Sequence, residues 1–130
     1  MQQSDQASRD RARTVLVVDD DRRVRDLLKL ALEEGGFAVE TAADGGEAIA
    51  MASAVRPGML VLDLTLPRAD GFAVAEAVRQ THGGAVPIVV ITADGSPAEK
   101  ARRIGAVGYL RKPFDVDDLA ELVGRTLGAD

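Results

Sequence analysis

Short apolar runs alternate with amphipathic stretches along nearly the whole chain, from Thr14 to Leu127. The first run, Val15 to Val18, is uninterrupted and largely β-branched, as expected of a strand that is covered on both faces. Each run is followed by a stretch whose apolar residues recur at helical spacing. This alternation favours repeated strand-helix units over an all-helical or all-strand fold. We count five units and predict an α/β fold, a doubly wound parallel sheet of five strands with five helices.

The expected elements follow from these runs and from the turn residues between them. Strands are predicted at residues 15–18, 37–41, 59–62, 87–91 and 107–110. Helices are predicted after Asp21, from about Asp44, after a loop over residues 67–71, after Ser96 and after Asp115. Asp21, Ser96 and Asp115 are expected to cap their helices with their side chains. His82 is expected to lie exposed in a loop.

Composition limits the kind of protein that this chain can be. One domain is expected at residues 14–128, and the polar residues 1–13 are expected to form a flexible N-terminal tail. The 21 acidic residues outnumber the 16 basic ones, so a direct nucleic-acid partner is not expected. Cysteine is absent, which excludes a disulfide scaffold and fits a cytoplasmic location. No apolar run approaches the roughly 20 residues that span a bilayer, so no membrane association is expected.

Charged side chains follow three of the predicted strands. Asp19 and Asp20 come directly after the first strand, Asp63 after the third, and Lys112 after the fifth. Because the carboxyl ends of parallel strands meet at one edge of a sheet, we expect three carboxylates and one lysine in one pocket. Adjacent carboxylates beside a third require a compensating cation. Oxygen ligands of this kind are the ones that Mg²⁺ prefers.

A carboxylate in this position can also act as a nucleophile toward phosphorus. It would form an acyl phosphate if metal, ammonium and hydroxyl donors neutralised the developing charge. Asp63, at the end of the neighbouring third strand, would complete the site. Lys112 could supply the ammonium group, and Thr92 the hydroxyl group.

The segments Val17 to Asp21, Val61 to Pro67 and Tyr109 to Phe114 resemble those of the receiver domain of response regulators in two-component signalling. The resemblance covers residues 14 to about 128. It implies a flavodoxin-like sheet with the strand order 2-1-3-4-5. It also implies a phosphorylation-controlled binding module, which receives a phosphoryl group from a histidine kinase or phosphotransfer protein and then binds a downstream protein target.

The resemblance assigns roles to individual residues. It implies that Asp63 is the phosphoryl acceptor and that Asp19, Asp20, Asp63 and the backbone carbonyl of Thr65 hold Mg²⁺. Lys112 would bind a phosphoryl oxygen, and the bond from Lys112 to Pro113 would be cis. Thr92 and Tyr109 would form the switch, with the hydroxyl group moving toward the phosphoryl group and the ring moving inward. The chain's own catalysis would be limited to phosphoryl transfer to Asp63 and slow hydrolysis.

Two alternatives remain open from the residues. A phosphatase of the haloacid dehalogenase type also begins with an aspartate at a strand end. Such enzymes place a second aspartate two residues later, where this chain has Thr65. The other alternative is a receiver-like interaction module that is not phosphorylated.

One departure from the family concerns dimerisation. Receivers that dimerise through the fourth helix, fifth strand and fifth helix carry two acidic residues before the aromatic residue of the fifth strand. Val107 and Gly108 occupy those positions here, so we expect a monomer. We expect Arg102, Arg103 and Arg111 to lie on this face and to suit an acidic protein partner.

Overall fold

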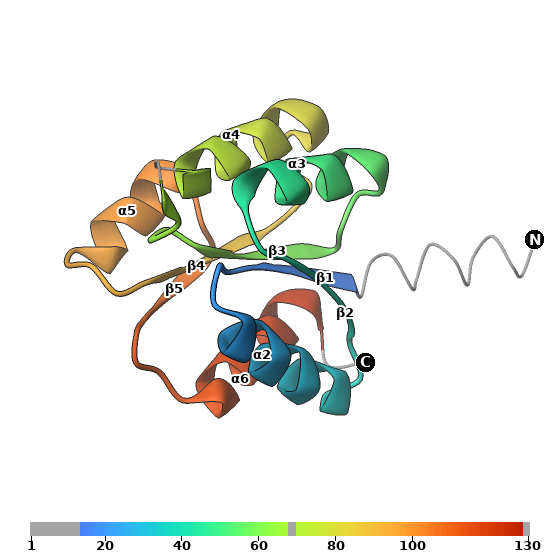
Figure 1. Cartoon of the computed structure of the whole chain (residues 1–130), viewed down its shortest axis with the longest axis vertical. Helices are drawn as coiled ribbons and strands as arrows, with labels where there is room; N and C mark the ends of the chain where they lie inside the picture. Colours follow the sequence, from blue (N-terminus) through green and yellow to red (C-terminus); the bar gives the residue numbers. More distant parts are fainter. Residues whose placement is uncertain (1–13, 68–69, 129–130) are drawn as a thin grey trace, which may run out of the picture.

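The computed structural model describes residues 14–67 and 70–128 as a parallel sheet between two layers of helices (Figure 1). The expected tail at residues 1–13 lies outside this part of the chain. The strands are β1 (Thr14–Val18), β2 (Ala38–Ala42), β3 (Met59–Asp63), β4 (Ile88–Thr92) and β5 (Gly108–Arg111). The helices are α2 (Arg22–Glu34), α3 (Gly45–Ala54), α4 (Asp70–His82), α5 (Pro97–Ile104) and α6 (Val116–Leu127).

The sheet order is β2-β1-β3-β4-β5, and all four strand pairs are parallel. Helices α3, α4 and α5 cover one face of the sheet, and α2 and α6 cover the other (Figure 1). The predicted fold class, strand order and five helices are therefore confirmed. None of the helices in the described ranges is long and apolar enough to cross a membrane.

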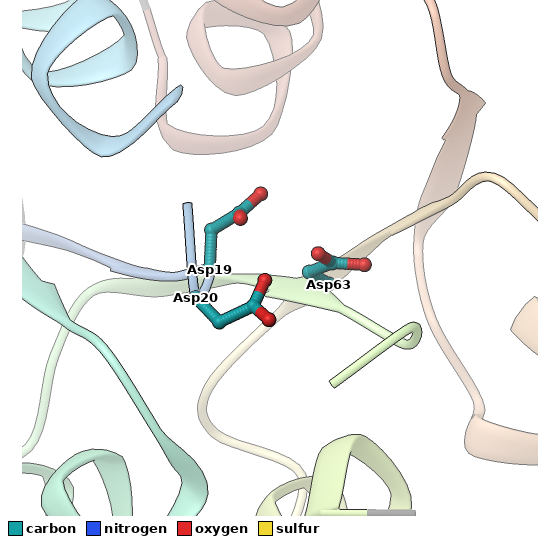
Figure 2. A group of neighbouring side chains, drawn as sticks. All are labelled: Asp19, Asp20 and Asp63. Atoms are coloured by element: carbon teal, nitrogen blue, oxygen red, sulfur yellow. The ribbon is translucent and has the colours of Figure 1, made fainter. Parts of the chain in front are cut away.

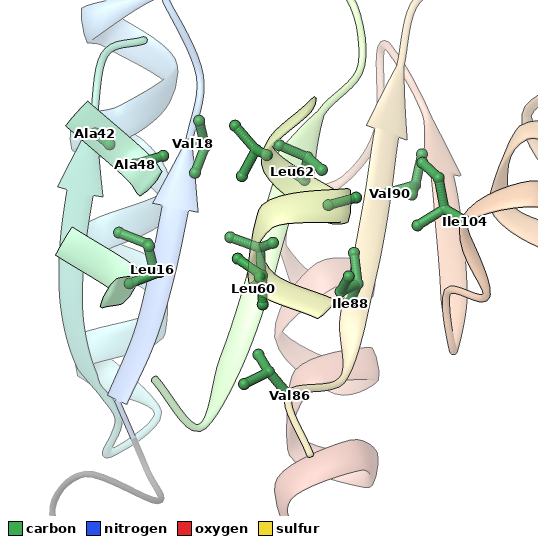
Figure 3. Packing of buried hydrophobic residues seen from close by; sticks show 14 of the residues in the cluster. Leu16, Val18, Ala42, Ala48, Leu60, Leu62, Val86, Ile88, Val90 and Ile104 are labelled. Carbon is green, nitrogen blue, oxygen red and sulfur yellow. The ribbon is translucent and has the colours of Figure 1, made fainter. Parts of the chain in front are cut away.

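Two apolar clusters fill the space between the sheet and its helices. Leu16 and Val18 of β1 join the cluster beneath α3, α4 and α5 (Figure 3). Val15 and Val17 join the cluster that contains Leu28 of α2 and residues of α6. Because successive side chains of a strand point to opposite faces, a strand with helices on both sides must be apolar throughout. This explains why the apolar runs at β1, β3 and β4, the three central strands, are uninterrupted.

The predicted side-chain caps at Asp21 and Asp115 are confirmed. Their carboxylates accept hydrogen bonds of 2.9 Å from the backbone N–H groups of Arg23 and Asp117. Ser96 precedes α5 as expected but makes no capping hydrogen bond with its side chain. Its φ of 60° places it in the left-handed region, whereas capping requires extended backbone. The prediction for Ser96 was therefore wrong.

The prediction for His82 was also wrong. It is the last residue of α4 and is half-buried, with Nε2 only 2.7 Å from the carbonyl oxygen of Ala52 in α3. The contact joins two neighbouring helices across 30 positions of sequence. Local sequence around His82 carries no signal for a partner so distant.

Candidate functional site

Three carboxylates gather at the carboxyl edge of the sheet, as Figure 2 shows. The paired register of β1 and β3 ends at Val18 and Leu62, so Asp19 and Asp63 lie one step further on neighbouring strands. Asp20 follows in the loop after β1. Each of the three aspartates offers an oxygen atom, and these atoms lie within 4.8 Å of one another. The side chains of Asp19 and Asp63 are buried, and Asp20 is exposed.

Lys112 reaches the two buried carboxylates from the far side of β4. Its Nζ donates hydrogen bonds of 2.9 Å to Oδ2 of Asp19 and 3.0 Å to Oδ2 of Asp63. Its backbone N–H donates to the carbonyl oxygen of Thr92, which ties the end of β5 to β4. The peptide bond from Lys112 to Pro113 is cis. The structure thus brings together the four charged residues that the sequence analysis placed in one pocket.

Burial, hydrogen bonds and neighbouring charges shift the pKa values of Asp19 and Lys112. Burial raises the pKa of Asp19, and the nearby charge of Asp63 adds to the effect, although hydrogen bonds from Asp21 N–H and Lys112 oppose it. Burial alone would lower the pKa of Lys112. Its hydrogen bonds and charge interactions with Asp19 and Asp63 outweigh that effect and raise the pKa. Lys112 is therefore the protonated partner of a cluster that holds more carboxylates than cations.

Hydrogen bonds to both oxygens fix the orientation of the Asp63 carboxylate. Lys112 holds Oδ2, and the backbone N–H of Thr65 donates to Oδ1 at 2.8 Å. The Thr65 hydroxyl group donates to the same Oδ1. Asp19 closes a similar turn, because its Oδ1 accepts from the N–H of Asp21 at 2.9 Å. An aspartate that binds the N–H two residues later is a common turn motif, so spacing could have predicted both contacts.

Two further contacts that support the site were missed by sequence reasoning. Arg25 of α2 donates from Nη1 to the carbonyl oxygen of Asp19 at 2.8 Å. Gly71 of α4 packs behind Asp63, where an added β-carbon would lie 3.0 Å from both the carbonyl oxygen of Asp63 and Cα of Leu64. Neither contact has a signal in the sequence, because each depends on how a helix is placed against a strand end.

Thr92 and Tyr109 are the two residues expected to form a switch. Thr92 ends β4 and is completely buried, and its hydroxyl oxygen accepts from the N–H of Asp94 at 3.1 Å. Tyr109 lies on the edge strand β5 with 46% of its surface exposed. The structure therefore places Thr92 at the end of the strand beside that of Asp63 and leaves Tyr109 exposed on the sheet edge.

The donor set fits a hard divalent cation. It consists of carboxylate oxygens alone, two of them from buried residues and one from Asp20 at the solvent side. The charge of Lys112 balances part of this cluster. Mg²⁺ suits such a site because it prefers one or two carboxylates and retains several water ligands.

Comparison with known proteins identifies the family. Residues 15–124 match the family model described as the response regulator receiver domain. The chain belongs to this family. Among curated proteins, the response regulator MprA of Mycobacterium avium is 46% identical over 107 residues. The match covers 81% of this chain and 46% of that protein, so this receiver domain spans about half the length of the curated relatives it matches.

Solved structures of receiver domains have the same fold. Chemotaxis protein CheY4 of Vibrio cholerae superposes with a TM-score of 0.78 at 37% identity, over 87% of this chain and 97% of that one. A response regulator receiver protein from Burkholderia phymatum gives 0.78 at 38% identity, over 88% and 94%. These matches confirm the predicted receiver domain.

Membership of the family decides between the functional alternatives. Receiver domains are signalling modules of two-component systems, and they interact with histidine kinases or phosphotransfer proteins. They bind Mg²⁺ through an acidic cluster of the kind found here. Neither the phosphatase of the haloacid dehalogenase type nor the unphosphorylated interaction module is favoured.

Proposed function

We propose that Asp63 of this receiver domain accepts a phosphoryl group from the phosphohistidine of a histidine kinase or phosphotransfer protein. The observation that carries this proposal is the buried Asp63 carboxylate, oriented through both oxygens beside Asp19, Asp20 and Lys112. An oxygen of Asp63 attacks phosphorus, the P–N bond of the donor breaks, and the imidazole leaves with the electron pair. The product is an acyl phosphate.

The neighbouring residues would lower the activation free energy of this phosphoryl transfer. Lys112 Nζ, already 3.0 Å from Oδ2 of Asp63, is in position to bind a phosphoryl oxygen. Asp19, Asp20, Asp63 and the carbonyl oxygen of Thr65 would hold Mg²⁺. The metal would supply charge neutralisation for the phosphoryl oxygens. The chain's own catalysis is then limited to this transfer and to slow hydrolysis of the acyl phosphate.

Intact-mass measurement after incubation with acetyl phosphate tests the proposal. We expect one added phosphoryl group in the presence of Mg²⁺, and loss of the label when the metal is chelated, because Lys112 alone cannot neutralise the cluster. The adduct should be stable in acid and labile in base and in hydroxylamine. Equal labelling with and without the metal would contradict the assignment.

An apolar groove beside the site offers a docking place for the phosphodonor. It has a volume of about 430 Å³ and is lined by α2 and by the segment around the cis bond, including Lys112 and Phe114. Leu27 of α2 lines it with 51% of its surface exposed. We propose that the donor's phosphohistidine-bearing helix packs here, because large exposed apolar residues mark interaction sites.

Replacing Leu27 with glutamate is expected to reduce transfer from a histidine kinase at least tenfold, because the charge would have to be buried against the donor. The kinase used must be one that phosphorylates the wild-type chain. Labelling by acetyl phosphate, which needs no docking surface, should be unchanged in the same variant. Radiolabel transfer assays measure the first effect, and equal rates from the kinase would exclude this docking site.

We propose that phosphorylation switches the packing of Thr92 and Tyr109. If the Thr92 hydroxyl group turns toward the phosphoryl group, the ring of Tyr109 gains space to move inward. Beryllofluoride, which stands in for the phosphoryl group, should therefore reduce the exposure of Tyr109 from its present 46%. NMR spectra should also shift from Thr92 to Leu110. Unchanged spectra in a protein saturated with the analogue would contradict the switch.

We further propose that the activated chain stays monomeric. Gly108 occupies a position where family dimers carry an acidic residue, and a β-carbon there would lie 3.0 Å from both Cδ1 and Cδ2 of Leu122 in α6. The neighbouring Val107 is exposed and carries no charge. Light scattering of the beryllofluoride complex should give the mass of one chain, and twice that mass would overturn the proposal.

The expectation for Arg103 needs a correction. Its guanidinium group does not lie on the face formed by α5, β5 and α6, because it packs over the ring of Phe72 in α4. Arg102 is exposed on α5, and Arg111 ends β5. The three arginines therefore do not form one patch.

A further inference from the structure

Residues of α4 and α5 line a groove. Both helices lie on the face of the sheet opposite α2 and α6 (Figure 1). The volume of the groove is about 500 Å³. The half-buried Phe72 and the buried Ala75 and Ile104 give it apolar walls. Arg79 of α4 and Arg103 of α5 also line it. None of the three carboxylates around Asp63 lines this groove, so it is a separate surface feature.

Packing orients both arginine side chains. Cζ of Arg103 lies 5.4 Å from the centroid of the Phe72 ring, within the range of a cation-π contact. The guanidinium group of Arg79 lies so close to Gly105, just after α5, that a β-carbon there would be 2.7 Å from Nη1. Gly105 also has a φ of 77°, which favours glycine. Each guanidinium group thus lies against the opposite helix or the residue that follows it, and within the described part of the chain neither forms an ion pair with a carboxylate.

The positive charge at the groove lacks an internal partner. Among residues 14–67 and 70–128, no carboxylate lies within ion-pair distance of Arg79 or Arg103. Glu76 is the acidic residue among those lining the groove, and its Oε1 accepts from Nε2 of Gln80 at 3.3 Å. Because the chain as a whole has a net charge of −5, the two arginines form a local positive site on an acidic protein.

We propose that this groove docks an acidic amphipathic helix of a protein partner. Two carboxylates of that helix bind Arg79 and Arg103, whose planar guanidinium groups suit carboxylate recognition. An apolar side chain between the carboxylates packs on Phe72 and Ile104, as anchors do in helix-in-groove recognition. The inference goes beyond the proposed phosphoryl transfer, because it specifies the chemistry of a protein partner that binds at a second surface.

Two other occupants fit the groove less well. A nucleic acid would bring a continuous row of phosphates, which the net charge of −5 and Glu76 would repel. A second copy of this chain could offer its acidic helix α6, which carries Asp117, Asp118 and Glu121. Because α6 and the groove lie on opposite faces of the sheet (Figure 1), one pair of copies cannot make both contacts at once, so this contact would give rings or open-ended assemblies and not a dimer.

A displayed library of short helical peptides, selected on the full wild-type chain, tests the proposal. We expect the recovered peptides to carry Asp or Glu on both sides of a large apolar residue. Anisotropy titrations should show about tenfold weaker binding for Arg103→Gln, and about a hundredfold for the double variant Arg79→Gln with Arg103→Gln. The variant Glu76→Gln should bind more tightly, because it removes a repulsive charge from the groove.

A matched double variant, Arg56→Gln with Arg125→Gln, removes the same charge elsewhere and should bind almost as tightly as the wild type. Thermal melting shows whether each variant is folded, and single variants replace any double variant that is not. The proposal is overturned if the recovered peptides are not acidic, or if they bind the folded arginine variants as tightly as the wild type. Concentration-dependent self-association that is lost in those variants would instead identify a second copy as the occupant and overturn the assignment to a different partner.

The same titration repeated with Asp63→Asn separates this inference from the proposed function. Peptide binding should persist in that variant, because the groove is formed in the unphosphorylated structure. Failure of acetyl phosphate to label the wild type would contradict the phosphoryl-acceptor role and leave the peptide result intact. If acetyl phosphate labels the wild type normally but peptide binding does not depend on Arg79 and Arg103, only the proposed docking groove is contradicted.

Discussion

Replacing Asp63 with alanine is expected to abolish labelling by acetyl phosphate in the presence of Mg²⁺. The label requires a carboxylate oxygen that is oriented beside a cation, and Asp63 is bound by Thr65 through one oxygen and by Lys112 through the other. Asp19 is equally buried and also contacts Lys112. Asp19 is therefore the residue most able to accept the phosphoryl group when Asp63 is absent. Intact mass combined with peptide mapping would detect phosphorylation of Asp19.

Asp26 provides the control for this experiment. It is an exposed aspartate of α2, paired with Arg22 at 3.8 Å on the helix surface. Its replacement with alanine should leave labelling unchanged. Asp63→Asn keeps the shape of the side chain and an oxygen acceptor for Thr65, so it shows whether loss of label in the alanine variant reflects chemistry or loss of the fold. Asp63 would be excluded as the acceptor if either Asp63 variant were fully labelled at the same residue that is labelled in the wild type.

Replacing Lys112 with methionine is expected to lower the free energy of unfolding by about 3–5 kcal/mol at neutral pH without metal, the range seen when one partner of a buried ion pair is removed. The change leaves the buried carboxylates of Asp19 and Asp63 together without their shared donor. Adding Mg²⁺ should restore part of the lost stability, because a divalent cation can neutralise both. Urea unfolding with and without Mg²⁺ measures both effects.

Lys100 is a suitable control for Lys112. It forms an ion pair of 3.5 Å with Asp94, whose side chain is largely exposed. Methionine at this position should change the free energy of unfolding by less than about 1 kcal/mol, because exposed ion pairs contribute little. Equal free energies of unfolding for the two methionine variants would contradict the prediction. An equal effect of Mg²⁺ on the stability of both variants would also contradict it, because Lys112 would then not stabilise the carboxylates of Asp19 and Asp63.

The main elements and the position of the site could be predicted because they depend on local patterns. The apolar run at Val15 to Val18 identifies a central strand, and Asp19 and Asp63 must then lie side by side because parallel strands end at one edge. Asp21 and Asp115 could be assigned as caps because a capping hydrogen bond spans only two residues.

The errors concern contacts that depend on tertiary arrangement. Ser96 has the right residue type for a cap, but the chain enters α5 in a left-handed conformation. His82 finds its partner in Ala52 of a different helix. Arg103 lies over Phe72 because of the way α5 is rotated against α4, and the spacing of residues in α5 does not determine that rotation. For His82 and Arg103, the deciding neighbour is distant in sequence. For Ser96, the surrounding structure sets the backbone conformation.

The placement of helices on both faces of the sheet determines how partners could share this chain. Residues of α2 line the groove at Leu27, and residues of α4 and α5 line the groove at Arg79. Helix α2 lies on one face of the sheet, and α4 and α5 lie on the other (Figure 1). A phosphodonor and an acidic helix would therefore bind on opposite sides of the sheet and would not compete for space. If both surfaces bind as proposed, the acidic partner is already bound before the signal arrives, and phosphoryl transfer to Asp63 would take place inside an existing ternary complex.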